Sequence, residues 1–485
     1  METSDADVVI VGAGLAGLTV ANRLIVQGCR VTVLERGEGP DYLCNSRIAS
    51  GSYNLAHSDP TAAPEILREA IMGDTEGAAD PALAVALAHA AGPALAWFRG
   101  EGAKFIKISR PGKAADNWSM APPRPSKPGF SWQGRGPDAN LRCLAKNFTD
   151  RGGKLMQGTR AKRLLMTNDI CIGVAVSCGD SLTNLRAKHV VLADGGFQGN
   201  RDLVRRFISP RPDCLVQRNA QTGQGDALVM AEQIGARLIG TDRFYGHLLV
   251  QEALTNNLLW PYPTIDTLAS SAIVIDRSGQ RFLDEGIGGV AMANRIAQLD
   301  DPLSAITIFD HAIWEGAGRA EFTPPNPYLV SSGGTLTSAD SLADLARAMD
   351  VPGDVLAATV AGYNQAVQSG DVARLQPGRT PGRMFGVLRS SATRTALRPV
   401  IEPPFHAIRL CAGITYTMGG IAIDDQARVL ADSGQPIAGL YAVGSCTGGL
   451  EGGPMAGYIG GLCKAVSLGY IAANAIAAIA TPAHA

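Results

Sequence analysis

The chain has 485 residues, of which 46% are hydrophobic and 18% charged, and its 43 basic and 44 acidic side chains leave a net charge of −1. This balance argues against nucleic-acid binding, which relies on a strongly basic surface. The length is about three times that of a typical domain of ~150 residues, so we expect two domains or one large domain with an insertion.

The cysteines and the two ends of the chain predict a cytoplasmic protein without a metal site. The nine cysteines include no C-x-x-C pair, which disfavours both a disulfide framework and a zinc site. Only Met1–Asp7 precede the body of the first expected strand, which leaves no room for a signal peptide. The apolar stretch Ala465–Ala480 is shorter than the ~20 residues that a membrane span needs, so we expect no membrane span.

The N-terminal segment has the pattern of a βαβ unit. We expect a buried strand over Asp7–Val11, a glycine-rich turn over Gly12–Gly17, a helix to Gln27 and a second strand over Arg30–Leu34, with Glu35 directly after it. Strand, G-x-G-x-x-G turn, helix, strand and acidic residue in this order are typical of dinucleotide binding.

The residues of this turn fit a nucleotide for physical reasons. Gly12 permits the tight turn, Gly14 lets the backbone approach a pyrophosphate, and Gly17 lets the helix pack close to the strand. The N-terminus of the helix favours the phosphate charge, and Glu35 can accept hydrogen bonds from ribose hydroxyls. A plain strand–turn–helix unit is the alternative interpretation.

The rest of the first part alternates loops, helices and strands. We expect a loop over Cys44–Asn54, helices within 61–100, an irregular excursion over 111–138 and a helix over Asn140–Arg151. Strands are expected at Lys154–Gly158, Ala161–Met166, Cys171–Ser177 and His189–Leu192, and a glycine turn opens a helix within 222–236.

The strand–helix alternation is lost between about 240 and 404 and returns at Gly413–Ala472. We therefore predict an α/β fold, in which a Rossmann-like nucleotide-binding domain (1–240 and 405–485) carries an inserted α+β capping domain (241–404).

The combination of six motifs resembles the flavoprotein family of fumarate reductases, tricarballylate dehydrogenases and 3-ketosteroid dehydrogenases. The motifs are Gly12–Gly17, Ala193–Phe197, Thr222–Ala227, Gly279–Gly286, Thr417–Gly420 and Gly439–Gly444. The resemblance implies that FAD binds across the first domain, that the inserted domain covers the isoalloxazine ring, and that the substrate lies between them.

The resemblance also implies a set of cofactor contacts. These are Gly12, Gly14, Leu15, Ala16, Gly17, Glu35, Arg36, Asn45, Ser46, Gly51, Ser52, Asp194, Gly195, Asp226, Gly444, Ser445, Gly460 and Gly461. Asp226 and Ser445 fall where the family holds the ribityl chain and the flavin. No family-style histidine precedes Ser46, so we expect FAD to be bound without a covalent link, with Cys44 as a packed thiol.

Departures from the family pattern disfavour dicarboxylate reduction. The fumarate reductases read HHTMGG where this chain has Thr415 and Tyr416, and the family's C-terminal arginine is absent from 451–461. The position of the family's catalytic arginine is taken by Trp314 in our interpretation. A dicarboxylate needs cationic partners once water leaves, because its charges must be compensated.

Tyrosines suit a different chemistry. A phenol has a reference pKa of ~10 and donates well to a ketone oxygen. Tyr416 and Tyr458 are therefore candidates to polarise a carbonyl or act as the base, and His247 is a candidate to orient substrate or relay a proton. Each of the three can instead be a packed structural residue. The candidate substrate contacts are Arg295 as a carboxylate anchor, Tyr262, Trp260 and Gly460.

The leading hypothesis is an FAD-dependent desaturase of the C–C bond α,β to the carbonyl of a small cyclic ketone, with or without a carboxylate. A base takes the α-proton while the β-hydride passes to flavin N5, and an external acceptor, oxygen or a carrier, reoxidises the flavin. The alternatives are a fumarate- or tricarballylate-type dicarboxylate enzyme, an ene-reductase, and a redox-silent flavin-binding scaffold.

Overall fold

The first βαβ unit forms the centre of the larger sheet. The computed structural model describes residues 5–108, 117–125, 127–179, 181–380 and 397–480. Within it, β1 (Ala6–Val11) is followed by α1 (Leu15–Ile25) and β2 (Val31–Leu34). β1 and β2 pair in parallel, and nearly all their side chains are buried, as expected for strands covered on both faces.

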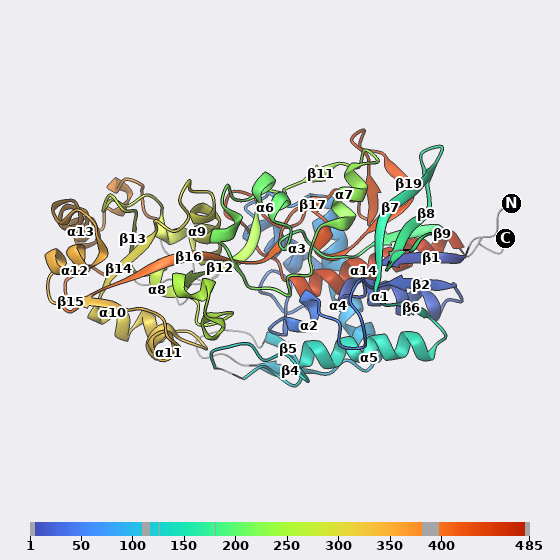
Figure 1. Cartoon of the computed structure of the whole chain (residues 1–485), viewed down its shortest axis with the longest axis horizontal. Coiled ribbons are helices and arrows are strands. Elements are labelled where there is room, and N and C mark those ends of the chain that lie inside the picture. Colours follow the sequence, from blue (N-terminus) through green and yellow to red (C-terminus); the bar gives the residue numbers. More distant parts are fainter. Residues whose placement is uncertain (1–4, 109–116, 126, 180, 381–396, 481–485) are drawn as a thin grey trace.

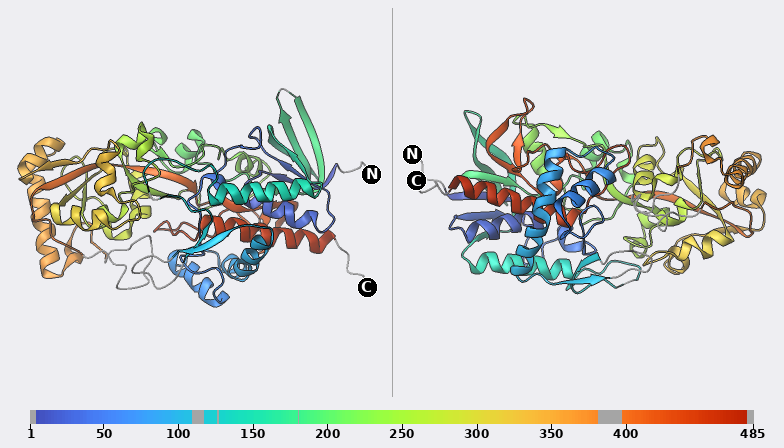
Figure 2. Two further views of the ribbon diagram at one scale, coloured as in Figure 1. Left: turned by 90° about the horizontal axis from the view of Figure 1, so that it is seen from below. Right: turned by 180° about the vertical axis from the view of Figure 1, so that it is seen from behind.

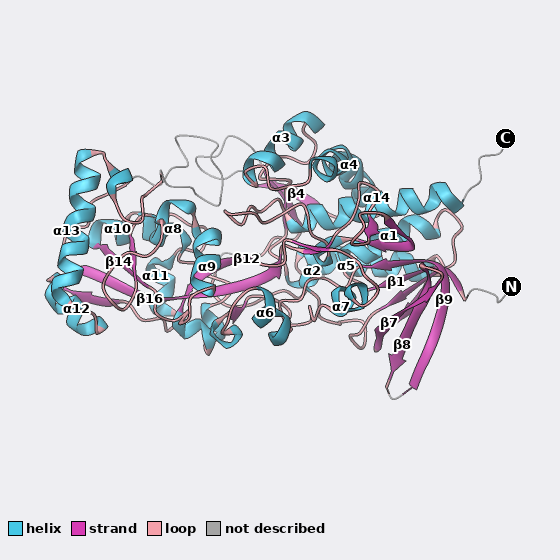
Figure 3. Cartoon of the chain, turned by 90° about the horizontal axis from the view of Figure 1, so that it is seen from above, coloured by secondary structure: helices cyan, strands magenta, loops and turns pink. Residues whose placement is uncertain are grey.

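The large sheet continues on both sides of this unit. Its order is β18-β19-β9-β1-β2-β6, and β9, β1, β2, β6 and β19 run parallel. β7 and β8 extend from β9 as an antiparallel ribbon that projects from the sheet (Figure 3). The further strands are β6 (Lys154–Met156), β7 (Thr159–Thr167), β8 (Ile170–Cys178), β9 (Ser181–Leu192), β18 (Arg428–Leu430) and β19 (Pro436–Ala442).

Helices cover this sheet, and the predicted helical stretch within 61–100 is present. They are α3 (Pro64–Asp74), α4 (Pro81–Gly100), α5 (Gly136–Asp150) and α14 (Gly461–Ala480). α14 is longer than the apolar tail suggested, and both α4 and α14 have the length and composition of a membrane span. However, α14 packs against α1 and α4, and half of each apolar window is buried inside the protein, as in core helices (Figures 1 and 2).

Two predicted irregular segments contain regular structure. The expected loop Cys44–Asn54 holds the short helix α2 (Asn45–Ile48) and the strand β3 (Ser52–Tyr53). β3 pairs with β5 (Asn117–Met120), which also pairs with β4 (Phe105–Ile108), so the expected excursion over 111–138 is in part a strand. These strands were missed because each is only a few residues long and gains its stability from non-local pairing. The remaining part of that excursion at 111–116 and 126 lies outside the described residues.

The cap has its own sheet and its own core. The strand order of this sheet is β10-β16-β14-β13, and β12 and β15 also pair with β16. The strands are β10 (Val216–Gln217), β12 (Phe244–Val250), β13 (Ile273–Ile275), β14 (Ile306–Asp310), β15 (Thr337–Ala339) and β16 (Phe405–Thr417), with β11 (Leu238–Ile239) and β17 (Gly420–Ile421) forming a separate pair.

Helices surround the cap sheet. They are α6 (Arg201–Phe207), α8 (Asp266–Ser270), α9 (Gly289–Ala297), α10 (His311–Glu315), α11 (Pro325–Ser331), α12 (Leu342–Met349) and α13 (Gly353–Ser369). α7 (Asp226–Glu232) instead packs against β7 of the large sheet. The cap occupies one end of an elongated molecule and the large sheet the other (Figures 1 and 2).

The predicted domain boundary at residue 405 does not match the sheet pairing. β16 begins at Phe405 and is the central strand of the cap sheet, and its residues Ala407, Ile408, Leu410 and Cys411 belong to the cap core. We therefore propose that the cap extends to Thr417. The strand–helix alternation of the sequence could not show this, because a pattern that predicts a strand does not reveal which sheet that strand joins.

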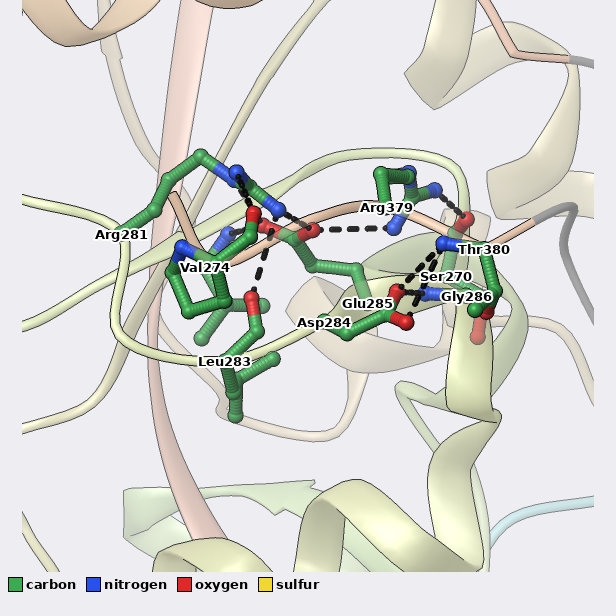
Figure 4. Close-up of polar contacts among 10 residues, drawn as sticks. Ser270, Val274, Arg281, Leu283, Asp284, Glu285, Gly286, Arg379 and Thr380 are labelled. Carbon is green, nitrogen blue, oxygen red and sulfur yellow. Dashed lines mark hydrogen bonds and ion pairs between the residues drawn. The ribbon is translucent and has the colours of Figure 1, made fainter. Parts of the chain in front are cut away.

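A buried ionic network stabilises the cap around the GQRFLDEG motif (Figure 4). Glu285 is fully buried and accepts hydrogen bonds from the Arg281 guanidinium at 2.9 and 2.6 Å, from Arg379 at 3.0 Å and from the Val274 N–H at 2.9 Å. Arg379 also donates to the Ser270 carbonyl. One carboxylate thus binds two buried guanidinium groups from segments almost a hundred residues apart.

Glu285→Gln removes this charge while keeping the side-chain shape. Loss of one partner of a buried ionic network leaves uncompensated charge, so we expect the free energy of unfolding to fall by about 3–5 kcal/mol. Urea unfolding followed by fluorescence measures this change. Glu315→Gln, which disrupts the solvent-exposed pair with Arg319, is the control and should have a much smaller effect because water screens that pair. Wild-type stability in Glu285→Gln would contradict the assignment.

Candidate active site

The large sheet and the cap enclose one cavity with about 1640 Å³ of empty space, its opening to solvent included. The loops after β1, β2 and β9 line one end of it. Residues of β12, β16 and the segment 260–262 line the other end, together with Tyr458 and the start of α14. Because the carboxyl ends of parallel strands meet at one edge of a sheet, this is the expected position for a ligand site in such a fold.

The glycine turn after β1 is shaped for close backbone approach. Gly12 has φ +106°, and a Cβ there would lie 2.5 Å from the Ala193 carbonyl oxygen. A Cβ on Gly17 would lie 2.0 Å from the Gly12 carbonyl oxygen. Gly14 lines the cavity, and a Cβ there would meet only the Ser46 Oγ, at 3.4 Å. Gly12 and Gly17 thus allow the turn, and Gly14 leaves room for a phosphate.

Ser46 and the start of α1 are directly connected. The Leu15 N–H donates to the Ser46 Oγ at 3.0 Å, and Leu15 is buried beneath the cavity rather than in its lining. Ala16 and Ser46 both line the cavity. The N-terminus of α1 therefore faces the cavity with its favourable partial charge for a phosphate.

Glu35 lies at the end of β2 with 5% of its surface exposed. Its carboxylate accepts the Ala13 N–H at 3.1 Å and the Gly37 N–H at 2.7 Å, and burial raises its pKa. A carboxylate has further lone pairs, so it can still accept bonds from ribose hydroxyls. Arg36 also lines the cavity and donates to the Thr222 carbonyl at 3.2 Å.

Asp194 has a buried oxygen that is available for a ligand. Its Oδ2 accepts the Ala227 N–H at 2.9 Å, whereas Oδ1 is buried without a hydrogen-bond partner. Burial, with a smaller contribution from the Asp226 charge, raises the pKa of Asp194 to about 7. Gly195 lines the same part of the cavity. A buried acceptor without a donor in the chain itself is what a hydroxyl-bearing cofactor would satisfy.

The structure places Asp226 at the Glu35 end of the cavity. Asp226 forms a bidentate ion pair with Arg160 at 2.8 and 2.6 Å. The neighbouring Thr159 N–H donates to the Glu35 carbonyl at 2.9 Å, which fixes this pair beside Glu35. The motif position did not predict this because Arg160 lies 66 residues away.

The middle of the cavity connects α2 to the cap. Asn45 donates to the Thr415 carbonyl at 3.0 Å and accepts the Ala220 N–H at 2.9 Å. Ser52, Gly444, Ser445 and Gly461 line the cavity as expected positions for cofactor contacts. Gly51 is outside the lining: its φ is +94°, and its carbonyl accepts the Met120 N–H at 2.9 Å, so its role is structural.

Three tyrosines form one cluster in the cavity. The Tyr245 and Tyr458 rings stack with centroids 4.0 Å apart, and the Tyr245 and Tyr416 rings lie 5.4 Å apart. Burial raises the pKa of each phenol, so all three stay protonated at neutral pH. A neutral phenol in this cavity can donate a hydrogen bond, but it would not ionise by itself.

The hydroxyl of Tyr416 is already engaged. It donates to Glu451 Oε1 at 2.8 Å, and the same carboxylate accepts the Ile459 N–H and pairs with the buried Lys464. This changes the prediction for Tyr416, because its proton faces Glu451 rather than a substrate carbonyl. The partner could not be found from the YTMGG motif, since Glu451 lies 35 residues away.

His247 is buried between an acid and a phenol. Its Nδ1 lies 2.5 Å from Asp266 Oδ2, and its Nε2 lies 3.1 Å from the Tyr245 hydroxyl. Burial lowers the pKa of His247, and Arg218 acts in the same direction against Asp266. The acceptor Asp266 favours the tautomer with hydrogen on Nδ1, which leaves the Nε2 lone pair to accept the Tyr245 proton.

The predicted substrate contacts divide into two groups. Trp260 and Tyr262 line the cavity, and Trp260 stacks on Phe130 at 5.1 Å. Arg295 lies on the exposed face of α9 and outside the cavity lining, so the structure does not place it as a carboxylate anchor. Gly460 is also outside the lining: a Cβ there would lie 2.1 Å from the Asn54 carbonyl oxygen, so this glycine allows close backbone packing.

Sequence reasoning missed several residues of the site. Tyr245 lies two positions before His247, so the alternation of side chains along a strand would have placed both on one face. Arg124 and Arg218 line the cavity but come from segments without a recognisable motif, and Glu451 lies beneath it. Only the fold brings Arg218 near Tyr245 and Glu451 to Tyr416, and places Arg124 beside Tyr262.

A Rossmann-like sheet, a cap and a cavity with a phosphate turn at one end and ionisable groups at the other define a flavin-dependent oxidoreductase. A family model described as FAD binding domain matches residues 7–457. The chain belongs to this family, and the predictions of the fold class, of FAD as cofactor and of an oxidoreductase are confirmed. Gly14, Glu35 and the unpaired Asp194 oxygen fit the diphosphate and the sugar of this cofactor.

The relatives are named for different activities. The chain is 27% identical to the NADH:fumarate oxidoreductase of Klebsiella pneumoniae (strain 342) over 92% of its own length and 45% of that protein. It is 29% identical to the 4-oxocyclohexanecarboxylate 2-dehydrogenase of Sinomonas cyclohexanicum over 63% of its length and 53% of that protein. The chain thus spans about half the length of these relatives.

A solved structure supports the fold. The 3-ketosteroid delta1-dehydrogenase from Sterolibacterium denitrificans, in complex with 1,4-androstadiene-3,17-dione, aligns over 98% of this chain and 100% of that one. The TM-score is 0.74 at 20% sequence identity. The two chains therefore share their architecture along their whole length.

We predict that FAD is released completely when the protein is precipitated with acid. Cys44 lines the cavity, but burial raises its pKa to about 12, so the thiol is not a ready nucleophile for a covalent link. The absorbance of the supernatant and of the redissolved pellet measures the two fractions. Flavin that stays in the pellet would contradict the prediction.

Asp194 should make the FAD-free protein less stable as the pH rises. Its carboxyl stays protonated in the folded state up to about pH 7, whereas the unfolded chain loses that proton near pH 3.8. The unfolded state therefore binds fewer protons in this window, and stability falls as the pH increases through it. Asp194→Asn should remove this contribution, so urea midpoints at pH 5 and pH 8 should differ less in the variant. An equal difference in both proteins would count against the raised pKa.

Proposed function

We propose that the chain is an FAD-dependent dehydrogenase that desaturates the C–C bond α,β to the carbonyl of a small cyclic ketone. The observation that carries the proposal is the cluster of Tyr245, Tyr416 and Tyr458 in the cavity, with His247 and Asp266 behind Tyr245. The Sinomonas relative, which is named for a cyclic keto acid, supports the same substrate class.

Tyr458 is the phenol best placed to polarise the carbonyl. Burial and then the Glu451 charge raise its pKa, while the Gly461 N–H acts in the opposite direction. A neutral phenol donates a hydrogen bond to the ketone oxygen, and this bond strengthens as negative charge develops there. Gly461 begins α14 and lines the cavity, so the positive end of that helix adds to the effect.

Tyr245 is the candidate base. Its high pKa means that it cannot ionise alone, so its proton must pass to His247 Nε2 as the hydroxyl oxygen takes the α-proton of the substrate. The resulting imidazolium is compensated by Asp266. FAD, when bound, accepts the second hydrogen together with both electrons of the broken C–H bond. We also propose an external acceptor, oxygen or an electron carrier, for its reoxidation.

Reduction of a dicarboxylate is the second candidate. Arg124 and Arg218 line the cavity, so the site holds more positive charge than the sequence suggested. The Klebsiella relative is named for fumarate. One observation argues against dicarboxylate reduction: Thr415 and Tyr416 occupy the position of the family's two histidines. Thr415 accepts a hydrogen bond from Arg218, and Tyr416 donates one to Glu451.

Anaerobic mixing separates the candidates. The oxidised protein is mixed with 4-oxocyclohexanecarboxylate, a 3-ketosteroid or succinate, and the chemically reduced protein with fumarate. We expect loss of the yellow flavin absorbance with the cyclic keto acid and formation of the α,β-unsaturated ketone. Flavin reoxidation by fumarate without bleaching by any ketone would favour the second candidate, and no reaction in any arm would favour a redox-silent scaffold.

Variants of the three tyrosines should differ in rate. Tyr245→Phe removes the group that relays the proton and should slow flavin reduction by ~10²–10⁴-fold, and Tyr458→Phe removes one carbonyl donor and should slow it by ~10²–10³-fold. Tyr416→Phe, whose hydroxyl bonds Glu451, should have a smaller effect. Anaerobic stopped-flow measurement at equal FAD content gives these rates. If Tyr416→Phe alone is slow, the roles of Tyr416 and Tyr458 are reversed.

A further inference from the structure

Two cationic side chains flank Tyr262 on the cap side of the cavity. The Arg218 guanidinium carbon lies 5.7 Å from the Tyr262 ring centroid, and that of Arg124 lies 5.4 Å from it. Both arginines line the cavity. Within the described residues, neither forms an ion pair with a carboxylate.

The absence of a counter-ion is unusual for this chain. Four arginines are buried within the described ranges, and Arg47, Arg281 and Arg379 each pair with Asp138 or Glu285. Arg218 is only 6% exposed, yet its partners are the neutral Pro261 carbonyl, at 2.8 and 3.3 Å, and the Thr415 Oγ1, at 2.7 Å. A buried cation without a compensating charge is costly unless a ligand supplies that charge.

Arg124 adds a second positive charge at the same place. Burial, followed by the charges of Arg218 and Arg135, lowers its pKa. It donates to the Gly129 carbonyl at 2.5 Å and lies near the Phe130 ring. The hydrogen bonds to neutral acceptors hold both guanidinium groups in position. Each guanidinium keeps further N–H donors, as a carboxylate-binding fork requires.

The surroundings indicate the shape of the ligand. The stacked pair Phe130 and Trp260 provides an apolar wall beside the arginines. Arg218 also acts electrostatically on Tyr245 and His247, so the cationic end and the proton-relay end belong to the same cavity. A ligand that satisfies all of these groups has a carboxylate at one end, an apolar ring and a neutral carbonyl at the other end.

We propose that Arg218 and Arg124 form a carboxylate subsite, and that the substrate is therefore a cyclic keto acid with a single carboxylate. This inference rests on the proposed function for the position of the ketone. The subsite takes over the role that the sequence suggested for Arg295, which lies outside the cavity lining.

A probe without a ketone tests the subsite separately from catalysis. The FAD-loaded protein is titrated by calorimetry with cyclohexanecarboxylate and with the neutral cyclohexanecarboxamide. We expect the carboxylate to bind more tightly than the amide in the wild type. In Arg218→Gln and Arg124→Gln the Kd of the carboxylate should rise by about 10- to 150-fold, the loss of one charge-assisted bond, while the Kd of the amide changes little.

Matched variants control for folding and for net charge. Arg205→Gln removes an equally positive but surface-exposed side chain and should leave both Kd values unchanged. If Arg218→Gln binds too little FAD for titration, Arg218→Lys takes its place. It retains the positive charge, so it should keep part of the wild-type affinity for the carboxylate. Unchanged carboxylate binding in both Arg218→Gln and Arg124→Gln would overturn the proposal, as would a large loss in Arg295→Gln alone.

Turnover measurements then distinguish failure of the carboxylate subsite from failure of the proposed desaturation. Carboxylate binding that depends on Arg218, without flavin bleaching by any keto acid, would support the subsite and contradict the proposed desaturation. Bleaching by cyclohexanone and by 4-oxocyclohexanecarboxylate with equal KM, together with arginine-independent binding, would support desaturation and overturn the subsite.

Discussion

The pairing of β12 with β16 is the constraint on which the site depends. Tyr245 lies opposite Tyr416, but the next residue, Gly246, lies opposite Ile414, so Thr415 is an extra residue in β16. Such a bulge locally changes the direction of side chains. A Cβ on Gly246 would lie 2.0 Å from the Gly413 carbonyl oxygen, so this register needs glycine at that position. Through this irregularity Tyr245, Thr415 and Tyr416 all line the cavity.

The two ends of the cavity differ in their charged groups. Glu35 and Asp194 lie at the end that fits the sugar of the cofactor, together with Arg36 and the ion pair of Asp226 with Arg160. At the cap end, Asp266 lies against His247, and Glu451 pairs with Lys464. Arg218 forms no ion pair with a carboxylate of the described residues. We propose that an anionic substrate supplies its counter-charge, since buried charge must be compensated by ligand or protein.

Local patterns predicted the parts of the fold and site that depend on neighbouring residues. The βαβ unit, the turn with Gly12 and Gly14, and Glu35 follow from short-range spacing, and the structure has them as expected. The contacts that the sequence did not predict join distant segments. Arg218 reaches Thr415 across 197 residues and Tyr416 reaches Glu451 across 35, and no periodicity in the sequence encodes such pairs. The boundary that we propose at Thr417 depends on the same kind of contact, because β16 joins the cap through partners about a hundred residues earlier.

The central claim is that the tyrosine cluster removes the α-proton of a cyclic ketone while the cofactor takes the β-hydrogen. The most direct measurement is single-turnover reduction of the flavin by 4-oxocyclohexanecarboxylate without oxygen, with identification of the product by mass spectrometry. The account predicts stoichiometric bleaching and a product that lacks two hydrogen atoms and contains a C=C bond conjugated to the ketone. An oxidised flavin that remains yellow with this ketone, in a protein whose reduced form is rapidly reoxidised by fumarate, would contradict it.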